Sequence, residues 1–440
     1  MVGIRPFRAL MYNQKRLKDI DRVTSPPYDI ISEEEQNQLY HNHPYNFVRL
    51  LFGKDYLDDN ETNNKYVRAA MYSNVWINEN IFVQDNKEGI YVYEMEFSHL
   101  NKVNKVMGFI SLVKLEYFEK GIIRPHELTF PKPKEDRLKL TKATKLNLSQ
   151  IYSMYPDSKK INSILKNKGK EDPIINIIDE KGVKHKLWKL NENETKEIIE
   201  EMKNKHIFIA DGHHRYETAL TYRDSIRGTS TAVKEDDPCN FTSMFLVGME
   251  DNDLVVLPTH RLIRNIKEFD VDSLLEKLEE NFKVKKFIFN KEELSTGKRR
   301  IFEIMKEEGN KANTFSIYIK GGLFYLITLK DDKALEKHLD ESKSLEWNKL
   351  DVIVCQRLII EEIFNKKTKE VTSGEDVSYT KNDDWAIQLV EDEKYQLAIL
   401  LNPPTVEQVK TISTKQEKMP HKTTYFYPKP ICGLTVYKLS

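Results

Sequence analysis

The feature that most constrains this chain is a short apolar run that ends in a cluster of polar residues. Residues 207–210 are apolar, and the residues that follow them are Asp211, Gly212, His213, His214 and Arg215. An apolar run of this length is typical of a buried strand, and apolar residues at helical spacing come next. Glycine permits a sharp turn between two elements because it adopts positive φ values at no steric cost. The stretch therefore predicts a buried strand that turns directly into a helix.

The start of this predicted helix is a candidate phosphate site. The first N–H groups of a helix have no partner within it, and the positive end of the helix dipole favours an anion. Arg215 adds a planar guanidinium group that can donate to two phosphate oxygens. Capping of the helix, the alternative role, needs only one short polar residue. We therefore expect this turn to bind a phosphate group.

A divalent metal is a second chemistry that the turn allows. No HExxH pattern and no third ligand lie near Asp211, and adjacent histidines at a helix start point in different directions. Zinc is therefore not expected. Mg²⁺ rarely uses an all-protein cage and is commonly held by one carboxylate and the phosphates of a substrate. We expect Mg²⁺ as the cofactor, with Asp211 as its protein ligand.

The composition limits the partners of such a site. The chain has 440 residues, enough for two or three domains, and its 69 basic and 69 acidic residues cancel. No overall charge therefore draws it to nucleic acid or to an anionic membrane. Its three cysteines form no CxxC pattern, and no segment resembles a signal peptide or a membrane helix. We expect a cytoplasmic protein without nucleic-acid or membrane partners, and we predict no oligomeric state.

Patterns along the chain predict a mixed α+β fold. Two alternating runs, at residues 90–97 and 106–117, predict paired antiparallel strands. Ser32 with Glu35 three residues later is typical of a helix start. A pair of glycines within residues 315–329 predicts a tight hairpin. The predicted parts are a catalytic region at 1–265, a smaller α+β domain at 266–400 and a C-terminal segment at 401–440 that returns to the active site.

Several polar clusters elsewhere are candidate substrate contacts. Glu127 follows a predicted strand and could take a proton from a substrate hydroxyl, or be a surface carboxylate. Residues 130–137 predict a proline-stiffened loop whose cations suit phosphate oxygens, or a solvated linker. Asp29 could hold an ammonium group or stabilise its own turn. Two segments combine a hydroxyl with a cation, which suits a phosphate or a carboxylate. The candidate residues of these clusters are Asp29, His126, Glu127, Lys132, Arg137, Thr259, His260, Arg261, Lys422, Thr423 and Thr424.

Taken together, these motifs resemble the ParB/sulfiredoxin-fold family of free L-serine kinases, particularly its long form that uses inorganic pyrophosphate. Archaeal ADP-dependent serine kinases carry Asp-Gly-His-His-Arg at the phosphate turn, and ParB and sulfiredoxin carry related Gly-x-x-Arg signatures. The resemblance runs in order through nearly the whole chain. Its stretches are residues 5–8, 25–29, 44–46, 125–127, 132–137, 210–215, 258–261 and 422–429.

The resemblance implies a ParB/sulfiredoxin-like core with an additional smaller domain, and a transferase that phosphorylates free L-serine. The product would be O-phosphoserine, made in serine biosynthesis by a reaction that could also run backwards. Pyrophosphate is the implied donor, and the lack of a Walker loop favours it. The alternatives are an ADP- or ATP-dependent serine kinase and a ParB-like nucleotide-dependent nucleic-acid binder, for which the neutral charge is unsuited.

The resemblance also implies roles for the candidate residues. The donor phosphates would lie on the turn from Asp211 to Arg215. Glu127, or Asp29 in its place, would deprotonate the serine hydroxyl. One of the two histidines of the turn would hydrogen-bond the transferred group. The other candidates, in particular residues 259–261, would receive serine or phosphoserine.

Overall fold

The computed structural model describes residues 1–229, 233–366, 376–420 and 422–439, which form two compact units. Unit 1 comprises Met1–Pro125, Thr129–Val255 and Phe426–Ser440. Unit 2 comprises His126–Leu128 and Val256–Tyr425. These bounds differ from those of the predicted domains. A compact unit need not fold by itself. The division into a catalytic region, a smaller α+β domain and a C-terminal segment therefore stays a prediction.

Unit 1 is built on a mixed sheet of nine strands in the order β6-β11-β8-β12-β5-β4-β10-β9, with β1 paired to β5. Strands β11 and β6 pair in parallel, as do β12 and β8, and the other pairs of this sheet are antiparallel. The strands are β1 (Ile4–Arg5), β4 (Tyr91–His99), β5 (Lys102–Lys114), β6 (Ile123–Arg124), β8 (Ile151–Tyr155), β9 (Ile175–Ile178), β10 (Lys184–Lys189), β11 (Ile207–Asp211) and β12 (Phe241–Gly248). Two short pairs accompany the sheet, β2 (Leu10–Tyr12) with β3 (Phe82–Gln84) and β7 (Leu146–Asn147) with β21 (Tyr437–Lys438).

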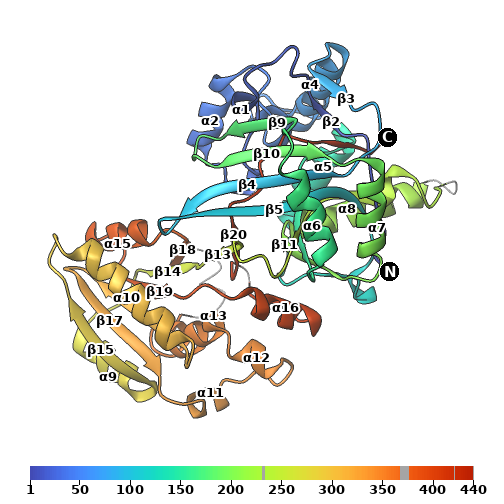
Figure 1. The fold of residues 1–440 in the computed structure, drawn as a ribbon. Helices are drawn as coiled ribbons and strands as arrows, with labels where there is room; N and C mark the ends of the chain where they lie inside the picture. Colours follow the sequence, from blue (N-terminus) through green and yellow to red (C-terminus); the bar gives the residue numbers. More distant parts are fainter. Residues whose placement is uncertain (230–232, 367–375, 421, 440) are drawn as a thin grey trace. The chain divides into compact units, whose positions relative to one another are not determined.

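One face of this sheet is covered by three helices, α6 (Lys159–Lys168), α7 (Glu192–Met202) and α8 (His213–Thr229) (Figure 1). Their apolar residues pack in one core with alternate residues of the strands. In β11, for example, Ile207 and Ile209 contribute to this core, because side chains of a strand alternate between the two faces. The other helices of unit 1 are α1 (Ile20–Val23), α2 (Glu33–Asn42), α3 (Val48–Leu51), α4 (Lys65–Asn78) and α5 (Pro131–Thr144).

The opposite face of the sheet is rich in aromatic rings, and we call it the aromatic face. The ring of Phe245 on β12 packs against two tyrosines of the same sheet, with ring centroids 5.0 Å from Tyr93 of β4 and 5.3 Å from Tyr152 of the adjacent β8. Phe426, near the C-terminus, packs edge-on against Tyr152 at 5.9 Å. The C-terminal residues therefore belong to the core of unit 1.

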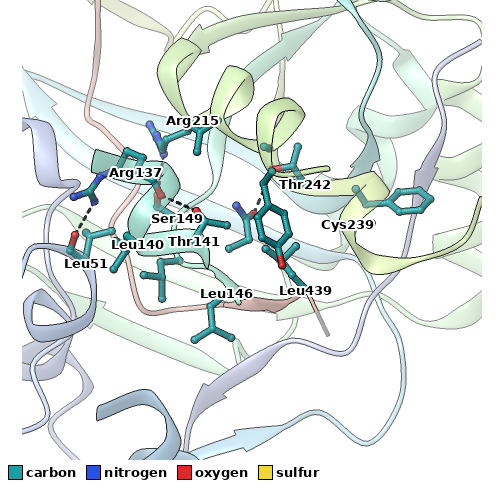
Figure 2. A pocket seen from close by; sticks show the side chains of 16 residues that line it. Leu51, Arg137, Leu140, Thr141, Leu146, Ser149, Arg215, Cys239, Thr242 and Leu439 are labelled. Carbon is teal, nitrogen blue, oxygen red and sulfur yellow. Dashed lines mark hydrogen bonds between the residues drawn. The ribbon is translucent and has the colours of Figure 1, made fainter. Parts of the chain in front are cut away.

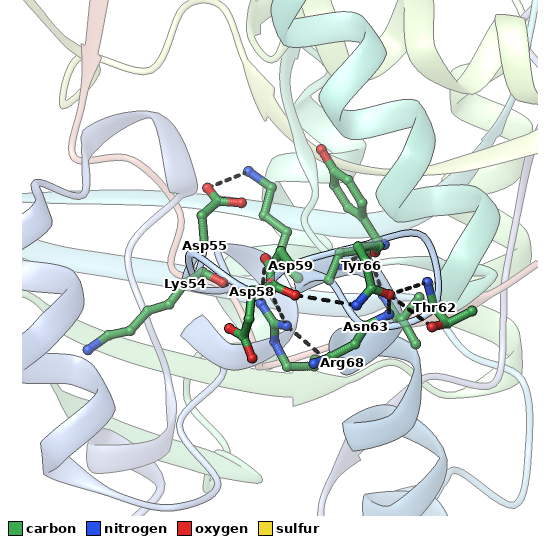
Figure 3. A network of polar contacts seen from close by, with 12 residues as sticks. Lys54, Asp55, Asp58, Asp59, Thr62, Asn63, Tyr66 and Arg68 are labelled. Carbon is green, nitrogen blue, oxygen red and sulfur yellow. Dashed lines mark hydrogen bonds and ion pairs between the residues drawn. The ribbon is translucent and has the colours of Figure 1, made fainter.

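A polar network holds the chain before α4 (Figure 3). A further contact connects this helix to α5. Arg68 donates to both carboxylate oxygens of Asp59, at 2.6 and 2.9 Å, which fastens the preceding loop to the helix. The Tyr66 hydroxyl donates to Asp136 of α5 at 2.8 Å. Asp136 in turn accepts from Arg137, whose guanidinium lies 4.1 Å from the ring centroid of Tyr28. This chain of contacts ends at the residue before Asp29.

Unit 2 contains an antiparallel sheet of six strands in the order β15-β17-β16-β19-β14-β18. Helices α10 and α15 pack on it around a core that includes Ile301, Tyr318 and Leu400. The strands are β14 (His260–Ile263), β15 (Phe282–Ile288), β16 (Thr314–Ile319), β17 (Leu323–Leu329), β18 (Val377–Thr380) and β19 (Leu397–Leu401). The helices are α9 (Val271–Asn281), α10 (Leu294–Gly309), α11 (Lys333–Glu336), α12 (Leu345–Asn348), α13 (Asp351–Val354), the π-helical turn Cys355–Glu361, α15 (Asp383–Glu391) and α16 (Val406–Thr414).

The structure confirms the α+β class and most of the predicted elements. The two alternating runs form β4 and β5, Ser32 accepts from the N–H of Glu35 at the start of α2, and the hairpin turns at two glycines with positive φ. The predicted loop at residues 130–137 is wrong, because Pro131 begins helix α5 and proline is well suited to the first helical position. No described helix is both long and apolar enough to cross a membrane.

The sheet of unit 1 makes a prediction about packing. At Gly108 of β5, an added Cβ would meet the carbonyl oxygen of Leu246 and lie 2.8 Å from the Phe245 ring. We expect Gly108→Ala to lower the free energy of unfolding by about 1–3 kcal/mol, because the strands cannot separate without loss of packing. Gly228→Ala is the control, since a Cβ added at that position in α8 would have no other described part of the protein within 4 Å. Urea unfolding measures both, and equal stability of the two variants would contradict the prediction.

Candidate active site

A β-bulge at the end of β11 decides which way Asp211 points. Ile209 pairs with Ser153, but Asp211, two residues later, pairs with the adjacent Tyr152, so the register shifts by one residue. Without this shift, alternation would direct Asp211 toward the helix-covered core, as it does Ile209. A bulge re-aims the side chain that follows it. Because Asp211 directly opposes Tyr152, its carboxylate lies on the aromatic face.

Gly212 makes the turn from β11 into α8, as predicted. Its φ is +99°, and an added Cβ would lie 2.9 Å from three guanidinium atoms of Arg215. Both the backbone conformation and the close guanidinium favour glycine at this position. The first hydrogen bond within the helix joins the N–H of Tyr216 to the carbonyl of Gly212. The strand-turn-helix junction predicted from the sequence is confirmed.

Four charged residues meet at this junction, and we call them the Asp211 cluster: Asp29, Asp211, Arg215 and Lys429. One oxygen of Asp211 accepts from Arg215 at 2.5 Å, and the other lies 2.6 Å from the ammonium nitrogen of Lys429. Lys429 also pairs with Asp29. Arg215 donates further to the carbonyl of Gln150 and, at 3.3 Å, to the hydroxyl of Ser149. The ion pairs thus join the four residues in a row of alternating charges, Asp29, Lys429, Asp211 and Arg215.

The ion pairs keep the cluster charged although the side chains of Asp211, Arg215 and Lys429 are largely shielded from water. Burial alone would raise the pKa of the Asp211 carboxyl, but the Lys429 ammonium and the Arg215 guanidinium outweigh it and hold the pKa well below its usual range. Burial alone would lower the pKa of Lys429, but Asp211 and Asp29 raise it well above its usual value. All three groups are therefore ionised at neutral pH. Asp29 is the most exposed member, with 36% of its side chain accessible.

The chain around Lys429 is held by backbone bonds to two other segments. Cys432 and Ser25 exchange hydrogen bonds of 3.2 and 2.8 Å through their backbones. The N–H of Ile431 donates to the Tyr93 hydroxyl at 3.4 Å, and this hydroxyl lies 2.8 Å from Nδ1 of His185, a fully buried residue. These contacts place the Lys429 ammonium beside two carboxylates that are remote from it in the sequence.

The two histidines of the turn lie in different surroundings. His213 is buried, with 3% exposure. His214 is half-buried, and its Nε2 accepts a hydrogen bond of 2.9 Å from the N–H of Phe130. Burial lowers the pKa of His214, and nearby Lys134 adds to this effect. His214 is therefore neutral at pH 7 with its proton on Nδ1, the nitrogen that remains able to donate.

The predicted cations of residues 130–137 have different environments. Lys132 is exposed in the first turn of α5. Lys134, which was not among the candidates, pairs with Glu217 of α8 at 2.7 Å. Arg137 is 7% exposed, and it donates to Asp136 and, at 2.7 Å, to the carbonyl of Leu51. The contacts of Arg137 hold Tyr28 and the neighbouring segments in place, so it supports the position of Asp29 from within the protein.

A small pocket lies beside Arg215 (Figure 2). It has a volume of about 50 Å³, and Leu140, Tyr222 and Phe241 are among the apolar residues that line it. Pockets for small organic ligands usually measure about 300–1,000 Å³. This pocket is therefore too small for a nucleotide, and it is not the predicted phosphate site.

The remaining candidates lie in unit 2, where several of them meet. Nε2 of His126 lies 2.8 Å from the hydroxyl of Thr424, and Glu127 forms a parallel bridge with Met419. Both Arg261 and Lys422 lie near the ring of Tyr379, at 5.6 and 5.3 Å from its centroid. The predicted candidates thus form two groups, the Asp211 cluster with its histidines in unit 1 and this set in unit 2.

Four candidates of unit 2 have contacts typical of core residues. His260 is 1% exposed, and its Nδ1 accepts a hydrogen bond of 3.2 Å from the N–H of Leu401. Burial lowers the pKa of His260 to about 4, so the ring is neutral at pH 7. The Thr423 hydroxyl donates to the carbonyl of Pro420 at 2.7 Å, and the carbonyl of Thr259 accepts from Arg261. His260 and Arg261 begin β14, which follows the short strand β13 (Val255–Leu257) after two intervening residues.

The Asp211 carboxylate does not fit the predicted metal role in this arrangement. Each of its oxygens is engaged by a cation, so a metal ion would have to displace Arg215 or Lys429. Within the described part of the chain, no group of three or more His, Cys, Asp and Glu side chains is placed to hold a metal. The requirement for Mg²⁺ stays a prediction, and we derive no step from it.

Comparison with known proteins identifies the family of the chain. Residues 4–353 match the model of a family described as a protein of unknown function, DUF1015. The chain belongs to the DUF1015 family. No significant match exists among curated proteins.

Solved structures that are similar to this DUF1015 chain have low TM-scores. A free serine kinase variant in complex with AMP has 12% identity and a TM-score of 0.35, with 72% of this chain and 87% of that chain covered. A conserved hypothetical protein from Pyrococcus furiosus has 13% identity and a TM-score of 0.34, with 75% and 95% covered. C-terminally truncated SbnI from Staphylococcus aureus has 11% identity and a TM-score of 0.35, with 74% and 87% covered. Since these scores are low, we base no conclusion on these similarities.

The main residue of the cluster that sequence reasoning missed is Lys429. It lies in the stretch at 422–429 that carries the resemblance, but it stands 218 positions after Asp211 in the sequence (429 − 211). Its segment contains other polar residues, and nothing in their spacing distinguishes this lysine. Glu217 was missed as well, although it stands three residues after His214 on the predicted helix, a spacing that places two side chains on one face.

The ion pairs of Lys429 predict a pH-dependent stability. We expect Lys429→Met to lower the free energy of unfolding at pH 7 by about 3 kcal/mol, because two carboxylates lose their shared cation in a buried site. A depressed carboxyl pKa contributes stability above the usual value of about 4, and this contribution is lost as the pH falls through the folded-state pKa. The difference between variant and wild type should therefore shrink below about pH 4.

Urea unfolding at pH 7 and at about pH 3.5 measures this difference. Lys166→Met is the control, because Lys166 is exposed on α6 and should change stability by less than about 0.5 kcal/mol. An equal loss for Lys429→Met at both pH values would contradict the prediction.

Proposed function

We propose that this protein is a phosphotransferase that makes O-phosphoserine from free L-serine, with inorganic pyrophosphate as donor and Mg²⁺ as cofactor. The observation that carries the proposal is the junction of β11 and α8. There Gly212 turns the chain at a positive φ, the start of a helix follows, and the Asp211 cluster lies at the same turn. The resemblance of its Asp-Gly-His-His-Arg sequence to serine kinases supports this specific reaction.

The chemistry of the reaction suits such a junction. Phosphoryl transfer depends on in-line positioning and on neutralisation of charge, with little covalent work by the protein. The N–H groups at the start of α8 would bind phosphate oxygens, because they lack partners within the helix. Lys429 and Arg215 would stabilise the charge that develops on the transferred group.

The balance of charges in the Asp211 cluster suits L-serine as the acceptor of the phosphoryl group. The two carboxylates and the two cations of the cluster cancel, so the cluster suits positively charged groups as well as anions. L-Serine carries both an ammonium and a carboxylate group, and a site of mixed charge suits it. Asp29, the most exposed member, would hold the ammonium group or accept the hydroxyl proton.

Incubation of the full-length protein with L-serine and Mg²⁺ tests the proposal. Pyrophosphate, ADP and ATP are supplied in separate reactions, and O-phosphoserine is detected by mass spectrometry. We expect product with pyrophosphate. Product with ADP or ATP alone would correct the donor and keep the serine kinase activity. No product with any of the three would overturn the proposal.

Arg215 gives a residue-level prediction. We expect Arg215→Ala to lower kcat/KM for serine about 100-fold or more, because it removes charge stabilisation in the transition state and a partner of Asp211. Arg227→Ala, an exposed change on the same helix, should leave the rate unchanged. Both are assayed below the Tm of the less stable variant. Full activity of Arg215→Ala would contradict its placement in the site.

The identity of the proton acceptor is tested by two carboxylate variants. The resemblance assigns this role to Glu127, and we expect Glu127→Gln to lower kcat by at least about 100-fold with little change in KM. Asp29→Asn should mainly raise KM for serine, because it weakens the binding of the ammonium group. Steady-state kinetics separates the two, with Glu119→Gln as a control on an exposed carboxylate. The reverse pattern would make Asp29 the base.

A further inference from the structure

One buried polar group near the Asp211 cluster has no protein partner. Ser25 is 2% exposed, and its hydroxyl makes no hydrogen bond to any described residue. Buried polar groups in folded proteins are nearly always hydrogen-bonded, to the protein, to water or to a ligand. Since no described residue bonds to the Ser25 hydroxyl, we expect its partner to be a water molecule or a ligand.

The pairing of Ser25 shows which way its side chain points. Ser25 and Cys432 face each other in an antiparallel bridge and exchange backbone hydrogen bonds of 3.2 and 2.8 Å. Residues directly opposite in such a bridge project their side chains to the same face. The Cys432 thiol is fully buried within electrostatic reach of Arg215, Asp29 and Asp211. The Ser25 hydroxyl is therefore on the side of the Asp211 cluster.

The Asp29–Lys429 ion pair supports the same placement of the Ser25 hydroxyl without reference to the Cys432 thiol. Asp29 lies four residues after Ser25, and Lys429 lies three residues before Cys432. The Asp29–Lys429 ion pair and the Ser25–Cys432 bridge thus join the same two short segments at both ends. Two prolines, Pro26 and Pro27, stiffen the chain between Ser25 and the ion pair. The hydroxyl is held at a fixed position beside the cluster.

We propose that the Ser25 hydroxyl is a ligand-binding group of this site and donates a hydrogen bond to a phosphate oxygen of the bound molecule. A neutral donor suits the position, because the formal charges of the Asp211 cluster already cancel and a further cation would upset that balance. The hydroxyl also complements the start of α8, whose N–H groups would bind other oxygens of the same phosphate. This inference rests on the proposed function.

Titration calorimetry on the full-length protein tests the inference, with inorganic pyrophosphate and O-phosphoserine as separate probes. We expect Ser25→Ala to weaken the binding of at least one probe about tenfold or more, because the lost hydrogen bond involves a charged acceptor. Ser111→Ala is the matched control. Ser111 is also fully buried with an unpartnered hydroxyl, but it pairs with Met244 and shares the helix-covered face of the sheet with it. Ser111→Ala should bind both probes with the affinities of the wild type.

The outcomes separate this inference from the proposed function. If wild-type protein binds a probe and folded Ser25→Ala binds it equally, the hydroxyl serves only a buried water, and the inference is overturned while the function stands. If wild-type protein binds neither pyrophosphate nor O-phosphoserine, both the inference and the proposed function are overturned. Should Ser25→Ala fail to fold, Ser25→Cys keeps the volume with a much weaker donor. It is expected to lose affinity in the same direction, and unchanged affinity would overturn the inference.

Discussion

The position of the Asp211 carboxylate between Arg215 and Lys429 is the contact on which the candidate site depends. A buried carboxylate is costly unless cations and hydrogen bonds compensate for its lost hydration. Here each oxygen has its own cation, and one of these cations is shared with Asp29. The same ion pairs join the end of β11, the turn around Asp29 and the C-terminal segment of unit 1. They therefore stabilise the local structure and define the charges that a ligand would meet.

Two backbone features bring this carboxylate to its place. The bulge in β11 moves Asp211 from the helix-covered core to the aromatic face, and Gly212 then turns the chain at a φ of +99° so that α8 can begin. Arg215 follows one helical turn after Asp211 and reaches back across the glycine to pair with it. Because the guanidinium lies against Gly212, any side chain at this position would disturb both the turn and the ion pair.

Local elements could be predicted because their signals are local. The strand-turn-helix junction, the β4–β5 pair and the helix start at Ser32 follow from spacing, turn residues and caps that lie within a few positions of one another. The loop at residues 130–137 was mispredicted because two prolines and several charges outweighed the possibility that proline begins a helix. The residue types of His260 and Arg137 suit a phosphate site, but burial and satisfied hydrogen bonds give both residues structural surroundings that no local pattern reveals.

Local patterns in the sequence are enough to predict the α+β class, the junction at residues 207–215 and the candidates Asp29, Asp211 and Arg215. Three features depend on the folded chain: Lys429 joins Asp29 to Asp211, the bulge re-aims Asp211, and the buried Ser25 hydroxyl has no partner among the described residues. The reason is physical. Propensities, caps and turns act over a few residues, whereas ion pairs and burial depend on which distant segments the sheet brings together.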